Sequence, residues 1–198
     1  MVSWAVLLWA VAGCYTPPDL PLLEQVPIEG PDFIPCADDI EDVRVACTIT
    51  GDAFDVEECF GGDDVRYRLL GVEAPDPGDC YGDDALDWLS DTIGSEVVTL
   101  TFDTVCVDGD EVKLAYVWAR GDLYDDLARD RNIEDLTRDY GDEEPAVMLN
   151  EVVLRLGVGR RRDEEIPGGL YYGPDFEAAA TAAEADRLGL YLACGAEG

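Results

Sequence analysis

Five short strand-like segments, bounded by turn residues and interrupted by helical patterns, restrict this chain to a small set of architectures. Strands are predicted where apolar and polar residues alternate or β-branched residues gather, over residues 43–50, 53–59, 65–72, 96–103 and 112–119. Gly51-Asp52, between the first two, predicts a tight hairpin turn. Apolar residues at helical spacing predict helices over residues 81–93, 147–156 and 176–188. This order predicts an α+β fold, a five-stranded OB-fold β-barrel with about three helices.

Composition and charge exclude several classes of site. The chain has 198 residues, of which 47% are hydrophobic, enough for the packed core of one domain. Its 13 basic and 45 acidic residues give a formal net charge of -32, which argues against a generic basic surface for nucleic acid. Histidine is absent from the sequence, which excludes Ser-His-Asp and Cys-His catalysis and histidine-ligated zinc.

The first residues predict a sorting signal. Residues 1–13 (MVSWAVLLWAVAG) are apolar and uncharged, and they are too few to span a bilayer, which takes roughly 20 residues. Val11-Ala12-Gly13-Cys14 resembles the bacterial lipobox, in which signal peptidase cuts before a cysteine that carries the lipids. We therefore expect a lipoprotein signal peptide over residues 1–13 and attachment to the membrane by a lipid anchor at Cys14, with no transmembrane helix. A plain signal peptide or a buried N-terminal helix is the alternative. Tyr15, rather than aspartate, after the cysteine favours the outer membrane or cell surface.

The next segment predicts a tether, and the remaining cysteines predict disulfides. Residues 14–40 are rich in proline and lack periodicity, which is typical of a semi-extended linker leading to a folded domain over residues 41–198. Setting Cys14 aside leaves an even number of cysteines, which suits disulfides in an exported chain, with buried free thiols as the alternative. These cysteines are Cys36, Cys47, Cys59, Cys80, Cys106 and Cys194.

Several segments, in order along the chain, carry a family resemblance. They are ITGDAFDV from Ile49, VRYRLLGVEAPD from Val65, CYGDDALDWL from Cys80, KLAYVW from Lys113 and LNEVVLRLGVG from Leu149. With the closing GLYLACG, they resemble the thermonuclease family (staphylococcal nuclease-like domains) over roughly residues 43–195, here as a divergent lipoprotein. The resemblance implies an OB-fold endonuclease. It also implies a disulfide between Cys80 and Cys194, since exported relatives often have both cysteines.

The resemblance further implies a calcium-dependent hydrolase site. Asp52 matches the first calcium carboxylate, Glu73 takes the place of the second, and Ala74 stands where a backbone carbonyl is the third ligand. Oxygen ligands of this kind suit Ca2+. Arg68 matches an arginine that clamps the phosphate, and Asp76 replaces the glutamate that helps to deprotonate the attacking water. Aspartate is one methylene shorter than glutamate, which reduces the reach of this base.

The sequence departs from the family at the second phosphate-binding arginine. Its position falls on Val112, and Lys113, the only lysine of the chain, is next to it and is a candidate substrate contact. Strand alternation predicts that Lys113 faces the opposite side unless the register slips by one residue. Residues 121–145 form a mostly acidic insert. An arginine of this insert (Arg129, Arg131 or Arg138) could replace the missing one, and a solvated helix or loop is the alternative.

A basic run and two tyrosines precede the last predicted helix. The resemblance implies that Tyr171 and Tyr172 are candidate substrate contacts, because the corresponding loop of the family carries tyrosines beside the bound nucleotide, and aromatic rings stack on bases. The run Arg160-Arg161-Arg162 would add positive charge, whereas neutralisation by the neighbouring Glu164 and Glu165 is the competing interpretation.

Two functions are compatible with these residues. The first is calcium-dependent phosphodiester hydrolysis of single-stranded DNA or RNA by a monomeric, surface-anchored domain, weakened by the loss of one catalytic arginine. The second is a catalytically inactive OB-type binding module at the cell envelope. The missing arginine, the shorter base and the net charge of -32 favour the second.

Overall fold

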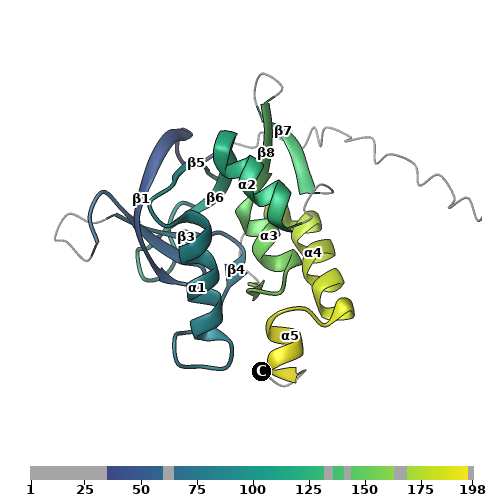
Figure 1. Cartoon of the computed structure of the whole chain (residues 1–198). Helices are drawn as coiled ribbons and strands as arrows, with labels where there is room; N and C mark the ends of the chain where they lie inside the picture. The colour runs from purple at the N-terminus through teal and green to yellow at the C-terminus, as the bar shows by residue number, and fades with distance from the viewer. Residues whose placement is uncertain (1–34, 60–64, 132–135, 141–143, 163–168, 196–198) are drawn as a thin grey trace, which may run out of the picture. The chain divides into compact units, whose positions relative to one another are not determined.

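A computed structural model of the chain describes residues 35–59, 65–131, 136–140, 144–162 and 169–195 (Figure 1). The chain divides into two units, Met1–Asp32 and Phe33–Gly198. The first unit lies outside the described residues, and with it the predicted signal peptide, Cys14 and most of the predicted tether. Within the described part of the chain, no helix combines the length and the apolar character that a membrane span requires.

Five strands of the larger unit close into a barrel. They are β1 (Ile40–Thr50), β2 (Ala53–Val56), β3 (Val65–Leu69), β5 (Val97–Thr101) and β6 (Lys113–Arg120). β1 pairs antiparallel with both β2 and β5, β2 pairs antiparallel with β3, and β5 pairs antiparallel with β6. The parallel pairing of β3 with β6 closes the ring. The arrangement is consistent with an OB-like fold, so the predicted α+β class and five-stranded barrel are confirmed.

Helices cover the barrel from several sides (Figure 1). α1 (Gly82–Ile93) packs against β1, α2 (Gly121–Arg131) packs against β6, and α3 (Leu149–Arg155) packs against α4 (Gly173–Asp186). A single turn, α5 (Leu190–Ala193), lies near the end of the described chain. About four helices are present where about three were predicted. The additional helix is α2, which lies in the insert and is so rich in charge that its apolar spacing is weak.

Two strand pairs extend this framework. β7 (Thr137–Tyr140) and β8 (Glu144–Met148) form a hairpin, and β8 pairs antiparallel with β6, so part of the insert continues the sheet. β4 (Val72–Glu73) pairs antiparallel with β9 (Arg160–Arg161) in a small second sheet. Gly71 separates β3 from β4. Its φ is +76°, and a Cβ there would lie 2.9 Å from the Phe176 ring, so both the turn and the close packing require glycine.

Asn150 of α3 holds the junction at which the barrel closes. It is fully buried, its Oδ1 accepts a hydrogen bond from the Val117 amide at 2.9 Å, and its Nδ2 donates to the carbonyls of Leu70 and Ala115 at 2.9 and 3.1 Å. Because Leu70 follows β3 and Ala115 lies in β6, one side chain satisfies buried backbone groups on both strands of the parallel pair.

Disulfides join all six cysteines of the described residues. The pairs are Cys36–Cys106, Cys47–Cys59 and Cys80–Cys194. The last of these is the pair that the family resemblance implies, and it connects the segment before α1 to the end of α5.

Candidate active site

Asp52 and Arg68 lie close together because of the register between β2 and β3. Asp52 occupies the turn between β1 and β2, and the next residue, Ala53, lies opposite Arg68. The amide of Leu69 donates a hydrogen bond to the Asp52 carbonyl at 2.8 Å. The Nε of Arg68 is 3.7 Å from Oδ2 of Asp52. The structure therefore brings together the carboxylate and the guanidinium that the sequence singles out.

The Asp52 carboxylate is buried and held from two sides. Asp52 is 6% exposed. The Thr50 hydroxyl donates a hydrogen bond to its Oδ1 at 2.6 Å, and the backbone amide of Ala74 also donates to the carboxylate. Burial raises the pKa of Asp52 above its ordinary value, although these hydrogen bonds and the charge of Arg68 act in the opposite direction. A Cβ on Gly51 would lie 2.8 Å from that of Ala74, so glycine allows the Ala74 segment to approach.

Asp108 is a second carboxylate on Arg68. Its Oδ2 accepts a hydrogen bond from Nη1 of Arg68 at 2.6 Å, and its side chain is 3% exposed. The amides of Asp110 and Val112 donate to its Oδ1 at 2.9 and 3.0 Å, so the same side chain organises the loop before β6. Sequence reasoning missed this residue. Asp108-Gly109 signals a local turn, but a local pattern does not show that the second oxygen reaches an arginine 40 residues away.

The other carboxylates expected at the site lie nearby in the chain but are exposed. Glu73 is in β4, opposite Arg160 of β9, and Asp76 follows Pro75 in the loop before α1. Within the part of the chain that the structure describes, neither side chain makes a hydrogen bond or an ion pair. Ala74, between them, is buried, and its amide is the group that contacts Asp52.

The donor atoms for a calcium ion are of a suitable kind. Asp52, Glu73 and the carbonyl of Ala74 offer the oxygen ligands that calcium takes. Among the described residues, no group of three or more acidic or cysteine side chains gathers as a metal site. A site of two carboxylates, one carbonyl and water molecules needs fewer side chains than that.

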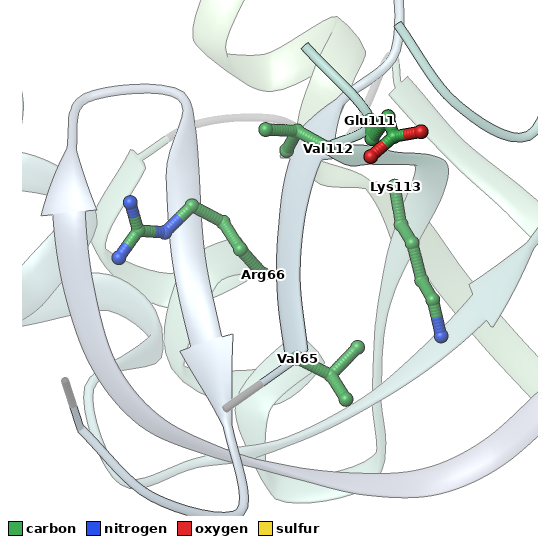
Figure 2. A pocket seen from close by; sticks show the side chains of 5 residues that line it. All are labelled: Val65, Arg66, Glu111, Val112 and Lys113. Atoms are coloured by element: carbon green, nitrogen blue, oxygen red, sulfur yellow. The ribbon is translucent and has the colours of Figure 1, made fainter. Parts of the chain in front are cut away.

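Lys113 is not directed to the face that carries Arg68. In the parallel register it lies opposite Tyr67, and its ammonium is 5.4 Å from the centroid of the Tyr67 ring, whereas Arg68 lies opposite Leu114. The alternation expected for this strand is therefore present. Lys113 instead lines an open pocket of about 380 Å³. Its ammonium and the guanidinium of Arg66 are directed to different sides of that pocket (Figure 2). The rest of that pocket is formed by Val65, Arg66, Glu111 and Val112.

The described arginines of the insert have carboxylate partners of their own. Arg129 pairs with Asp126 at 2.8 Å. Arg138 pairs with Glu151 at 2.6 Å and with Asp175 at 3.4 Å, which attaches β7 to α3 and α4. The side chain of Arg131 lies outside the described residues. The contacts of Arg129 and Arg138 are thus those of surface and anchoring ion pairs.

The two tyrosines differ in their surroundings. Tyr172 packs edge-on against Tyr116 and Trp118, with ring centroids 4.9 and 6.0 Å apart, and the Arg138 guanidinium lies 5.5 Å from its ring centroid. Tyr171 is 45% exposed, and its amide donates to the buried Asp103 at 2.9 Å. Tyr171 therefore presents more surface to a ligand than Tyr172 does.

The basic run before these tyrosines is partly neutralised by a residue that the sequence did not single out. Arg161 forms an ion pair with Glu177 of α4. Glu164 and Glu165 lie outside the described residues.

Comparison with models of known protein families and with curated proteins finds no match for this chain.

Proposed function

We propose that this chain is a thermonuclease-like domain, anchored to the cell envelope by a lipid at Cys14, that hydrolyses phosphodiester bonds of single-stranded DNA or RNA with calcium. The observation that carries the proposal is the pairing of Asp52 with Arg68, 3.7 Å apart, at the edge of an OB-like barrel. A buried carboxylate beside a guanidinium provides a metal ligand and a phosphate clamp in one place.

Each residue has a distinct role in this proposal. Arg68 binds the phosphate oxygens and stabilises the charge that they develop in the transition state. Asp76 accepts a proton from the attacking water, and its exposed position leaves it accessible to solvent. Asp52, Glu73 and the carbonyl of Ala74 would hold calcium, whose chemistry when bound is to neutralise phosphate charge. Tyr171 is a candidate for a contact farther along the DNA or RNA, whereas Lys113 is directed away from the face that carries Arg68.

Hydrolysis is expected to be slow. Val112 occupies the position of the second arginine, and loss of a transition-state arginine costs roughly 1,000-fold or more in phosphoryl transfer. Val112 and the pairing of Arg68 with Asp108 favour a second candidate function, a catalytically inactive OB-type module that binds a ligand at the envelope.

A cleavage assay separates the two functions. The purified full chain, with its disulfides formed, is incubated with fluorescently labelled single-stranded DNA or RNA, in calcium or in chelator. Under the first proposal, cleavage depends on calcium, and Arg68→Ala reduces it by about 100-fold or more. Arg44→Ala removes the same charge from an exposed site on β1, where the guanidinium donates to the Ser95 carbonyl, and should stay within about twofold.

The outcomes are distinct. Absence of cleavage by a folded chain, with retained binding of the strand, supports the inactive module. Absence of both cleavage and binding contradicts hydrolysis and moves the search to other ligands. Equal losses in Arg68→Ala and Arg44→Ala would show that general charge, rather than the site, controls the rate.

A further inference from the structure

We infer that Asp108 is the anion that Arg68 holds in the free protein, so that a phosphate must compete with this carboxylate for Arg68. The inference rests on the proposed function in one respect, that Arg68 is the group that meets phosphate. It adds a residue that determines which anions the site accepts.

The contact has the geometry of a strong, charge-assisted hydrogen bond. Nη1 of Arg68 and Oδ2 of Asp108 are 2.6 Å apart, and the side chains are 23% and 3% exposed. A carboxylate oxygen and a phosphate oxygen use the same guanidinium N–H groups. A phosphate oxygen that takes the N–H group bonded to Asp108 must therefore displace the carboxylate.

Asp108 is already positioned to make this contact. Its Oδ1 accepts hydrogen bonds from two amides of its own loop, and the Asp108 amide donates to the Val112 carbonyl at 2.9 Å. The loop is held at its start by the Cys36–Cys106 disulfide. An anion fixed in this way competes at a high effective concentration, so it disfavours free anions that bind through a single oxygen.

The neighbouring arginine of β3 shows what a more extensive pairing looks like. Arg66 donates two hydrogen bonds to Asp55, at 2.7 and 3.1 Å, and Asp55 is fully buried on the adjoining strand. Asp108 reaches Arg68 through one hydrogen bond, and the Nε of Arg68 is buried without a hydrogen-bond partner. The Asp108–Arg68 pair therefore uses a single N–H group of the guanidinium, and a phosphate that binds bidentately forms one hydrogen bond more.

The local charge gives the contact its selectivity. Asp52 and Asp108 both lie within 4 Å of Arg68, at 3.7 and 2.6 Å, so two carboxylates face one guanidinium. An approaching anion meets a net negative site and must also separate an ion pair. Displacing Asp108 is consequently easier for an anion that presents two oxygens to the guanidinium than for one that binds through a single oxygen.

The test replaces Asp108 by asparagine. Asparagine keeps one oxygen, which serves the loop amides or Arg68 but not both, and it loses the charge. Asp110→Asn is the matched control, because Asp110 is exposed in the same loop and the substitution removes the same charge. With isotopically labelled full chain, inorganic phosphate is titrated while the Arg68 Nε–Hε resonance is followed by NMR. We expect the affinity to rise at least tenfold in Asp108→Asn and less than twofold in Asp110→Asn.

Further variants complete the test. Asp108→Ser keeps a hydroxyl acceptor for the loop amides and should show the same gain in phosphate affinity. This variant controls for the possibility that asparagine loosens the loop. Thermal unfolding checks that each variant is folded. In the Arg68→Ala/Asp108→Asn double variant the gain should vanish. Equal effects of Asp108→Asn and Asp110→Asn, or no phosphate binding at Arg68 in any folded variant, would overturn the inference.

The failure of each proposal is recognisable. Tighter phosphate binding in Asp108→Asn without DNA or RNA cleavage would support the role of Asp108 and contradict hydrolysis. The opposite result is cleavage by the wild-type chain, with neither faster cleavage nor tighter phosphate binding in Asp108→Asn. It would support hydrolysis and contradict the role of Asp108.

Discussion

Replacing Asn150 by alanine should destabilise the barrel at its point of closure. Asn150 provides hydrogen bonds to the Val117 amide and to the carbonyls of Leu70 and Ala115. The Ala115 carbonyl also accepts from the Leu70 amide at 2.9 Å, so it keeps a partner. The other two groups lose the partner that Asn150 gives them, at about 1–3 kcal/mol each. We expect the free energy of unfolding to fall by about 4 kcal/mol.

Urea unfolding of the disulfide-intact chain, followed by tryptophan fluorescence, measures this change. Asp91→Ala, at an exposed position of α1, is the control and should stay within about 0.5 kcal/mol. Asn150→Asp keeps the size but turns an oxygen toward the two carbonyls, so its destabilisation should grow as the pH rises and the carboxyl must ionise. A loss below about 1 kcal/mol in Asn150→Ala would refute the reasoning, because it would mean that other groups satisfy the junction equally well.

Three further predictions concern other parts of the domain. Serine at both Cys80 and Cys194 should lower the free energy of unfolding by about 2–5 kcal/mol in urea, because the bond closes a loop across a sequence separation of 114. Burial raises the pKa of Asp52, so the folded state keeps this proton to higher pH than the unfolded state, and the contribution of Asp52 to stability falls as the pH rises above about 4. Asp52→Asn should flatten that part of the stability–pH curve, and an unchanged slope would contradict this assignment. Arg138→Gln should lower stability by about 2 kcal/mol, because it leaves the carboxylate of Glu151, a residue only 6% exposed, without its guanidinium. Glu151→Gln in the same chain should restore most of that loss, as a double-mutant cycle would show.

The barrel strands could be predicted from the sequence because their pattern is local. Alternation of apolar and polar residues placed β1, β2, β3, β5 and β6 to within a few residues. The predicted strand over residues 65–72 instead divides at Gly71 into β3 and β4. A glycine inside a strand pattern is a sign of a break, but only the packing against Phe176 shows why this one must be glycine.

The insert could not be predicted in the same way, since its structure depends on distant partners. α2 is mostly charged, and among its described side chains Leu123 and Leu127, one helical turn apart, are buried, with Tyr124 partly buried beside them. Arg138 reads as one charge among many in the sequence. Its ion pairs with Glu151 and Asp175 join residues of β7, α3 and α4, and such a meeting is a property of the packed domain.

The candidate site shows the same limit in its charges. The family resemblance pointed to Asp52 and Arg68, and the register between β2 and β3 explains why they meet. The same resemblance describes Val112 as the loss of one cation. The structure adds that Asp108, whose amide partner is Val112, places its carboxylate on Arg68. A carboxylate with a 3% exposed side chain is strongly disfavoured without a cation, and Val112 cannot supply one. Under the proposed function, the valine and the Asp108–Arg68 pair belong to one redistribution of charge, in which Arg68 neutralises the protein's own carboxylate and a phosphate must compete for it.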